Sequence, residues 1–144
     1  MSRTRPPDGF FHITTRAVAQ TPAFFDDIDR LSFLRLLGEC VARFDWTLYA
    51  YCLMTTHYHL LVHARREAVS AGMQRLNGLH ARRVNRRLGR SGHLFAARYS
   101  PWAVDTEEHA LATCRYVLTN PVRAGLCGRA EEWPWSGSRY GKTP

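Results

Sequence analysis

The sequence predicts an α+β fold of the ferredoxin-like, split βαβ kind, with an antiparallel sheet and a C-terminal helical extension. Strand-like and helix-like runs follow one another in the order strand, helix, strand, strand, helix, strand, helix. The chain has 144 residues, of which 45% are hydrophobic, and this is enough for one domain with a buried core. We expect this domain to span residues 1–144, with 1–8 disordered and 121–144 packed as a tail on the body.

The first half of the chain predicts a strand, a helix and a hairpin. Residues 10–15 are β-branched and aromatic, which is typical of a strand. Residues 26–44 have apolar side chains at helical spacing. The expected buried stripe of this helix is Ile28, Leu31, Leu34, Leu37 and Val41. Residues 46–54 and 57–64 predict two paired strands, because only two threonines separate them.

The second half predicts two helices and a strand at a sheet edge. Residues 69–88 form a helix whose apolar face is Val69, Met73, Leu76, His80 and Val84. Residues 98–104 form a strand, at an edge because Pro101 cannot donate a ladder hydrogen bond. Asp105 and Glu108 resemble a capping box at the start of a helix that reaches about Thr119. We expect Pro121 to end this helix, because the residue before a proline disfavours the α region.

Positive charge is concentrated in one quarter of the chain. The formal net charge is +8. Between Arg65 and Arg98 there are nine arginines and one acid, Glu67, whereas the rest of the chain has eleven basic and eleven acidic residues. Such a local excess is typical of a nucleic-acid partner, and a solvated arginine-rich helix is the alternative. The expected DNA contacts are Arg75, Arg82, Arg83, Arg86, Arg87, Arg98 and Arg123.

Several protein classes are excluded by what the sequence lacks. No apolar stretch approaches the roughly 20 residues of a membrane helix, and no apolar run follows the basic N-terminus as it would in a secretory signal. The four cysteines are far apart and form no CxxC pair, which gives a zinc ribbon no support. We expect reduced thiols in a cytoplasmic, nucleoid-associated protein without a membrane partner.

Two histidines on one predicted strand indicate a candidate metal site. Alternate residues of a strand share a face, so His57 and His59 project together, about 7 Å apart. Two imidazoles in this arrangement can bind one divalent ion. A hydrogen-bonded histidine beside an incidental one is the alternative. His63 lies on the same face and could contact phosphate or compete as a ligand.

The last predicted helix turns a tyrosine away from its apolar stripe. That stripe is Leu111, Cys114 and Leu118. At about 100° per residue, Tyr116 lies on roughly the opposite side, together with Thr113 and Asn120. Such a tyrosine is solvated, covered by the C-terminal tail, or directed at a functional group. Asn120 lies one turn later and can approach the same target.

Taken together, these residues predict phosphodiester chemistry. A tyrosine phenolate can attack a phosphodiester and form a covalent phosphotyrosine. A cation held by His57 and His59 would polarise the phosphate oxygens, and the Asn120 carbonyl is a candidate third ligand. Imidazole, amide and phosphate ligands fit Mg²⁺ or Mn²⁺, and Zn²⁺ also accepts imidazoles.

Five segments carry a family pattern through nearly the whole chain. They are FHITTRA (11–17), YAYCLMTTHYHLLVHA (49–64), NRRLGRSGHLFAARY (85–99), RYVLTNPVRAGL (115–126) and WPWSGSRY (133–140). In this order they resemble the REP-associated tyrosine transposases, a branch of the insertion-sequence tyrosine transposases within the HUH (His-hydrophobic-His) nuclease superfamily. Thr56 departs from the pattern, because the family usually has Asn before the first histidine.

The resemblance implies a ferredoxin-like catalytic domain that cleaves and rejoins single-stranded DNA through a 5′-phosphotyrosine, on repeats that form hairpins. By position, His57 and His59 are the histidine pair, Tyr116 is the nucleophile and Asn120 is the polar residue one turn later. Similar enzymes act as monomers or as homodimers that exchange the tyrosine helix, and the sequence decides neither. Two competing hypotheses are a catalytically inactive nucleic-acid-binding module of the same fold and, more weakly, a histidine RNase.

Overall fold

The computed structural model describes residues 8–19, 21–96 and 99–142. The predicted order of strands and helices is confirmed, and the described tail adds a short 3₁₀ helix and a fifth strand. The elements are β1 (Asp8–Arg16), α1 (Asp27–Arg43), β2 (Thr47–Leu53), β3 (His57–Arg65), α2 (Arg66–Leu88), β4 (Ser100–Val104), α3 (Glu107–Arg123), η1 (Ala130–Glu132) and β5 (Ser136–Ser138). The disorder expected for residues 1–8 concerns residues outside the described ranges, except Asp8, which begins β1.

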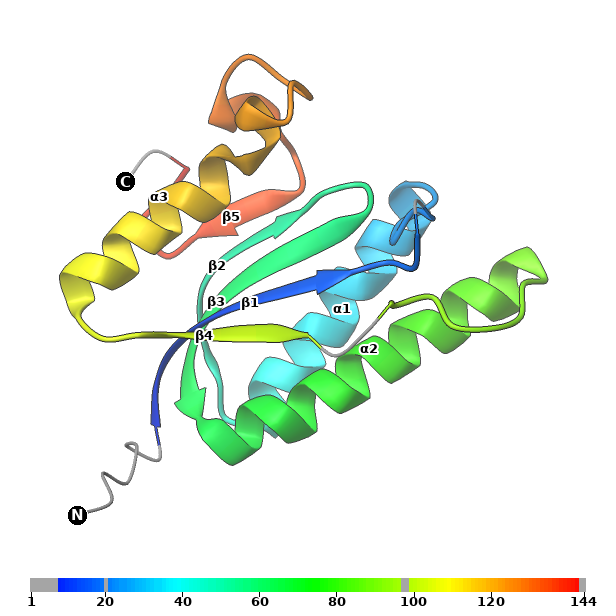
Figure 1. Cartoon of the computed structure of the whole chain (residues 1–144), viewed down its shortest axis with the longest axis horizontal. Coiled ribbons are helices and arrows are strands. Elements are labelled where there is room, and N and C mark those ends of the chain that lie inside the picture. The colour runs from blue at the N-terminus through cyan, green and yellow to red at the C-terminus, as the bar shows by residue number, and fades with distance from the viewer. Residues whose placement is uncertain (1–7, 20, 97–98, 143–144) are drawn as a thin grey trace.

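The five strands form one antiparallel sheet in the order β4-β1-β3-β2-β5. The predicted α+β, ferredoxin-like arrangement is therefore confirmed, and β5 extends the sheet beside β2. β4 lies at the opposite edge, as Pro101 predicted. Figure 1 shows α1 and α2 side by side, with α3 apart from them. Within the described residues, no helix is long and apolar enough to span a membrane.

Side chains of β3 alternate between two hydrophobic cores. Tyr58, Leu60 and Val62 pack in the core that α1 and α2 cover, whereas Leu61 packs in the core that α3 covers. Because alternate residues share a face, the histidines at positions 57 and 59 lie on the α3 face of the sheet. The sheet thus separates an α1/α2 layer from the layer that contains the candidate site.

The buried stripe of α1 agrees with the predicted one only in part: Leu37 is buried, and Leu34 and Val41 pack half-buried against the core. Ile28 and Leu31 are 59% and 61% exposed. The residues buried in this helix are Asp29, Phe33, Leu36, Leu37 and Cys40. Both sets have helical spacing and share Leu37, so periodicity alone did not determine which face packs. Phe33 decides it, because its ring fills the space between Phe24 and Tyr58.

The buried face predicted for α2 is confirmed at all five positions, although the helix begins at Arg66 instead of Val69. Gly72 allows the helix to approach Trp46 closely, since a Cβ atom there would lie 2.3 Å from the indole ring. The indole Nε1 donates a hydrogen bond to the Ala68 carbonyl oxygen at 2.9 Å. The packing of α2 on Trp46 therefore requires glycine at position 72.

The first turn of α3 differs from the predicted capping box. The N-cap is Thr106 and not Asp105. The Thr106 hydroxyl accepts a hydrogen bond from the backbone N–H of His109 at 3.0 Å. Threonine therefore caps the helix one residue later than predicted, since Asp105 as N-cap would have accepted from the N–H of Glu108.

The last turn of α3 continues through Pro121, so the prediction that this proline ends the helix was wrong. Proline has no N–H, and the Val117 carbonyl therefore loses its usual donor four residues later. The side-chain amide of Asn120 lies 3.3 Å from that carbonyl oxygen and donates to it. This local replacement allows the helix to reach Arg123 and places residues 121–123, expected in the tail, within α3.

Candidate active site

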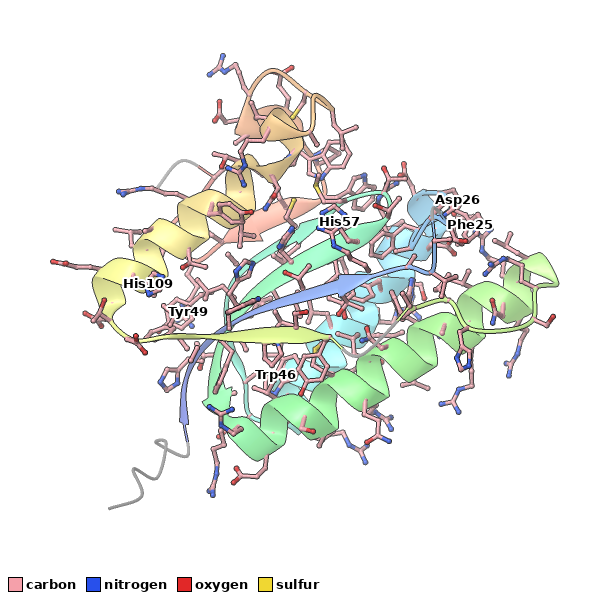
Figure 2. All side chains as sticks on the ribbon, viewed as in Figure 1. Phe25, Asp26, Trp46, Tyr49, His57 and His109 are labelled. Carbon is pink, nitrogen blue, oxygen red and sulfur yellow. The ribbon has the colours of Figure 1, made fainter. Side chains whose placement is uncertain are left out.

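Rings from three elements meet on the α3 face of the sheet. His12 lies on β1, His57 and His59 lie on β3, and Tyr116 lies on α3. The ring centroid of Tyr116 is 6.3 Å from that of His59 and 5.9 Å from that of His12, both in edge-on contacts. The two β3 histidines have centroids 5.1 Å apart, and Figure 2 shows His57 at the beginning of its strand. The structure therefore brings the predicted tyrosine and the predicted histidine pair together within one chain.

Tyr116 is open to solvent, with 49% of the residue exposed. The two tail tryptophans pack against the cores, Trp133 with α3 and Trp135 with the α1/α2 layer. The Arg123 guanidinium carbon lies 4.1 Å from the centroid of the tyrosine ring. The same guanidinium donates a hydrogen bond to the Tyr116 carbonyl oxygen at 2.7 Å. A fixed positive charge therefore lies over the phenol ring.

His59 is buried, and one of its ring nitrogens has two partners. Nδ1 lies 3.0 Å from Nε2 of His12 and 3.2 Å from the Thr14 hydroxyl oxygen. Burial, reinforced by the neighbouring His12 and His57 rings, lowers the pKa of His59 to about 3. The ring is neutral at physiological pH, and a proton donated from Nδ1 leaves the lone pair on Nε2. Among the described residues this buried Nε2 has no hydrogen-bond partner.

His57 is held in a similar way by its neighbour in the chain. Its Nδ1 lies 3.2 Å from the Thr56 hydroxyl oxygen. Burial and the nearby Arg16 guanidinium lower the pKa of His57 to about 4. Thr56, the departure from the family pattern, thus contacts the ring of the first histidine. A neutral imidazole with Nδ1 engaged can present Nε2 to a ligand.

Two neutral imidazoles on one face fit a divalent metal ion. The buried Nε2 of His59 favours this reading, because a buried polar atom without a partner is uncommon and a bound ion would satisfy it. Within the described ranges no cluster of three His, Cys, Asp or Glu side chains suits a metal ion. The predicted ligand set of two histidines and one asparagine does not depend on such a cluster.

Asn120 lies one turn beyond Tyr116, with its amide group used inside α3. Nδ2 donates to the carbonyl oxygens of Tyr116 at 3.1 Å and Val117 at 3.3 Å. The acceptor Oδ1 is the atom that could serve as a metal ligand. In the part of the chain that the structure describes, no hydrogen bond or ring contact joins Asn120 to His57 or His59. The structure thus places Tyr116 beside the histidines and Asn120 one turn after Tyr116, with the Asn120 amide hydrogen-bonded inside α3.

A cavity of about 570 Å³ lies beside Tyr116. It is lined by residues of β1, β3, β4 and α3. Figure 2 shows one of them, His109, in the first turn of α3. None of the lining residues is acidic, and Arg16 contributes a positive charge. A cavity of this size and charge can accept a phosphodiester and its neighbouring base.

The predicted arginines of α2 lie on the other face of the sheet. α2 packs with α1 against the core opposite α3, so these arginines do not surround Tyr116. Arg87 forms ion pairs with Asp26 and Asp29, each with an N–O distance of 2.9 Å. Arg83 donates a hydrogen bond to the Ser32 hydroxyl at 2.6 Å. Both of these predicted arginines therefore have partners within the protein.

The other predicted DNA contacts are distributed differently. Arg75 and Arg82, together with Arg43 of α1, line a separate cavity of about 550 Å³. Arg86 is exposed on α2, and Arg98 lies outside the described residues. Arg123, as described above, is the one predicted arginine of the described chain that contacts Tyr116.

His63 is on the α3 face but distant from Tyr116 along β3. Its ring makes an edge-on contact with Phe10, at a centroid distance of 4.9 Å. Within the described residues, no ring contact or hydrogen bond connects His63 with His57, His59 or Tyr116. The extra histidine therefore contributes to the packing of β1 on β3.

His12 is a site residue that sequence reasoning missed. In the β1–β3 register, Thr14 lies opposite His59, and His12 lies two residue pairs further along, opposite Leu61. Burial lowers the pKa of His12, which favours a neutral ring that can accept a hydrogen bond from His59. The alternation of His12 and Thr14 in the first predicted strand was a usable signal. The register that places them beside His59 could not be read from the sequence.

Comparison with known proteins identifies the family. A family model described as "Transposase IS200 like" matches residues 9–120, from β1 to the turn after Tyr116. The chain belongs to the IS200-like transposase family. A comparison with curated proteins finds no match. Membership of this family supports the assignment of the chain as a transposase, that is, as an enzyme that processes DNA.

Two solved structures share the fold of this IS200-like transposase. A REP-associated tyrosine transposase bound to a REP hairpin has a TM-score of 0.75 and 14% identity, over 94% of this chain and 82% of the other. A proposed transposase from Deinococcus radiodurans R1 has a TM-score of 0.55 and 18% identity, over 78% of this chain and 92% of the other. At these identities the likeness establishes the fold, and it agrees with the family assignment.

Proposed function

We propose that this IS200-like transposase cleaves and rejoins single-stranded DNA through a covalent 5′-phosphotyrosine on Tyr116, next to a divalent metal ion held by His57 and His59. The observation that supports this most strongly is the contact between a half-exposed phenol and the neutral His59 ring, whose buried Nε2 has no partner among the described residues.

Tyr116 supplies the nucleophile in this proposal. Its phenol oxygen attacks the phosphorus, the bond from phosphorus to the 3′ oxygen breaks, and the phenolic proton passes to solvent. The departing 3′ oxygen takes a proton from water, and the downstream strand stays attached as a 5′-phosphotyrosine ester. A 3′-hydroxyl that attacks this ester reverses the steps and rejoins the DNA. The exposure of Tyr116 allows the strand to reach it.

The surrounding residues orient the reactants and supply positive charge. His57 and His59 would hold Mg²⁺ or Mn²⁺ through ring nitrogens, and the Asn120 carbonyl is the third candidate ligand. When bound, such an ion polarises the phosphate oxygens and stabilises charge in the transition state. His12 orients His59 through Nδ1. Arg123, over the Tyr116 ring, adds a charge that favours the phosphate.

Hairpin-forming repeat DNA is the substrate that we propose. The support is the REP hairpin bound to the structurally similar transposase and the basic residues of this chain. Arg43, Arg75 and Arg82 would contact phosphates far from the scissile position, because they lie on the opposite face of the sheet. Since Tyr116 meets His59 of the same chain, one protomer suffices for the chemistry. A protein with this partner acts in the cytoplasm at the nucleoid.

A covalent-trapping experiment tests the proposal. Hairpin DNA labelled at its 3′ end is incubated with the protein and Mn²⁺, because the fragment joined to tyrosine keeps that end. We expect a labelled protein–DNA adduct that maps to Tyr116 by mass spectrometry and disappears with chelator or in Tyr116→Phe. The control Tyr140→Phe removes another exposed hydroxyl and should retain the adduct.

Other outcomes would identify the competing functions. An adduct in Tyr116→Phe would exclude this nucleophile. Binding without any adduct under saturating Mn²⁺ would support an inactive nucleic-acid-binding module. Cleavage of RNA that survives chelation would support a histidine RNase, since a 2′-hydroxyl would then replace the tyrosine.

A further inference from the structure

Trp102 is an exposed tryptophan whose position is not explained by packing in the core. It is 67% exposed, the largest exposure among the exposed large hydrophobic side chains of the described chain. The other three tryptophans are buried or half-buried, and Trp46 and Trp133 donate their indole N–H to backbone carbonyl oxygens. An exposed tryptophan on a strand loses favourable burial. Its location therefore indicates a partner outside the folded chain.

That location is the wall of the candidate active site. On β4, Trp102 pairs directly with His12 of β1, so the two side chains project from the same face of the sheet. The His12 ring contacts Tyr116 at a centroid distance of 5.9 Å. Trp102, His12 and Tyr116 line the same cavity of about 570 Å³. The indole therefore flanks the place where the scissile phosphate would lie.

The cavity has the chemistry of a single-strand nucleic-acid site. Its lining combines the aromatic surface of Trp102 with the cation of Arg16 and contains no acidic residue. Ala112 and Thr113 of α3 are small lining residues and leave room for a planar ring. An aromatic platform beside positive charge is how proteins stack unpaired bases while they hold the backbone. A base within a duplex is already stacked on both faces and cannot use this platform.

The strand that carries Trp102 is open on its outer side. β4 is the last strand at one edge of the described sheet, with β1 as its neighbour. A DNA strand can thus pass over this edge into the cavity without crossing another element of the sheet. Tyr140 is an exposed aromatic residue next to β5, at the opposite edge, and does not line this cavity.

We propose that Trp102 stacks on an unpaired base adjacent to the scissile phosphate and thereby positions that phosphate at Tyr116. This inference rests on the proposed DNA-cleaving function and adds a positioning residue to it. Trp102 acts through the base that it holds. Its removal should raise the concentration of DNA needed for binding more than it slows cleavage of DNA that is already bound.

Tryptophan fluorescence tests the proposal without any cleavage. Tyr116→Phe protein in the absence of divalent metal is titrated with a short single-stranded oligonucleotide and with a matched oligonucleotide that carries one abasic position. We expect quenching by the first, because Trp102 is the exposed indole. Moving the abasic position along the strand should identify one place where affinity falls by about 5- to 150-fold, the range for loss of one stacked base.

Variants show whether Trp102 is responsible. Trp102→Ala in the same background should bind both oligonucleotides equally, whereas Trp102→Phe should keep most of the preference. Tyr140→Ala is the control and should keep all of it. Thermal melting checks that each variant is folded. If Trp102→Ala keeps the full preference for the intact strand, or if saturating DNA leaves the indole fluorescence unchanged, the proposal is wrong. Because no metal or phenol is needed, these results do not depend on cleavage.

Discussion

Replacing His12 by phenylalanine tests how His59, the second histidine of the proposed metal pair, is oriented. In the structure, Nδ1 of His59 has two partners, the His12 ring nitrogen at 3.0 Å and the Thr14 hydroxyl at 3.2 Å. Phenylalanine retains a planar ring beside His59, where the two rings now stack at 5.3 Å, and near Tyr116. It removes the ring nitrogens, among them the Nε2 acceptor that faces His59. Any change in metal binding then reports on the hydrogen bond and not on packing.

The size of the effect follows from the number of partners that remain. Loss of a hydrogen-bonded supporting group of a metal-binding histidine typically lowers metal affinity by about 10- to 100-fold. Thr14 still holds Nδ1 in His12→Phe, so we expect the lower end, about tenfold or roughly 1.4 kcal/mol. Thr14→Val should have a similar effect. The double variant leaves Nδ1 without either partner, and its loss should approach about 100-fold.

The assay is Mn²⁺ binding followed by electron paramagnetic resonance of the free ion, without DNA. Circular dichroism and melting confirm that each variant is folded. The reasoning predicts a graded loss from the wild type through the single variants to the double variant. Equal Mn²⁺ affinity in the wild type and the double variant would refute it, because the ring of His59 would then need no support from β1.

Two further predictions concern the fold and its dependence on pH. Gly72→Ala should lower the free energy of unfolding by about 1–3 kcal/mol, because its Cβ atom would meet the Trp46 ring. Gly78→Ala on the same helix meets no atom within 4 Å and should instead stabilise the protein by about 0.5–1 kcal/mol, as urea titrations of the pair would show. The folded chain lowers the pKa of His57 to about 4 and the pKa of His59 to about 3, from the ordinary value of 6.5. As the pH falls below 6.5, the unfolded chain therefore binds protons at these histidines before the folded chain does. The free energy of unfolding should therefore fall between pH 6.5 and about 4, and His59→Gln should flatten that dependence; equal slopes in the two proteins would contradict it.

Local patterns predicted the elements of this fold well, because strand alternation and helical spacing are properties of consecutive residues. The five buried positions of α2 were identified in this way. In α1 the same reasoning was wrong at Ile28 and Leu31, since two stripes with equal spacing share Leu37. Only the position of Phe33 against Phe24 and Tyr58 decides between them. The contact with Tyr58 joins segments that are distant in the sequence, so the spacing of apolar residues within the helix could not predict it.

The end of α3 shows a different limit. The rule that proline terminates a helix assumes that the freed carbonyl has no other donor. Here the preceding asparagine supplies one through its side chain. Asn120 therefore has a structural function beside the ligand function that the sequence predicted. A prediction based on backbone preferences alone could not include it.

The candidate site was predicted in part because its residues have distinctive chemistry. His57, His59 and Tyr116 stand out by type and spacing, and the structure brings them together. His12 and Trp102 were missed because their relation to the site depends on the pairing of β1 with β3 and β4. Register is a long-range property of the sheet. The arginines of α2 show the same limit. Their charge predicted a nucleic-acid contact, but the sequence did not reveal that they lie on the face of the sheet opposite Tyr116.

The central claim is that an ion held by two neighbouring imidazoles lies within reach of a phenol from the last helix. Anomalous diffraction from a crystal of this protein grown with Mn²⁺ tests that claim most directly. We expect one peak bonded to ring nitrogens of His57 and His59, with the Tyr116 hydroxyl facing it. A Mn²⁺ peak at another position, or an empty histidine pair at saturating Mn²⁺, would contradict the account.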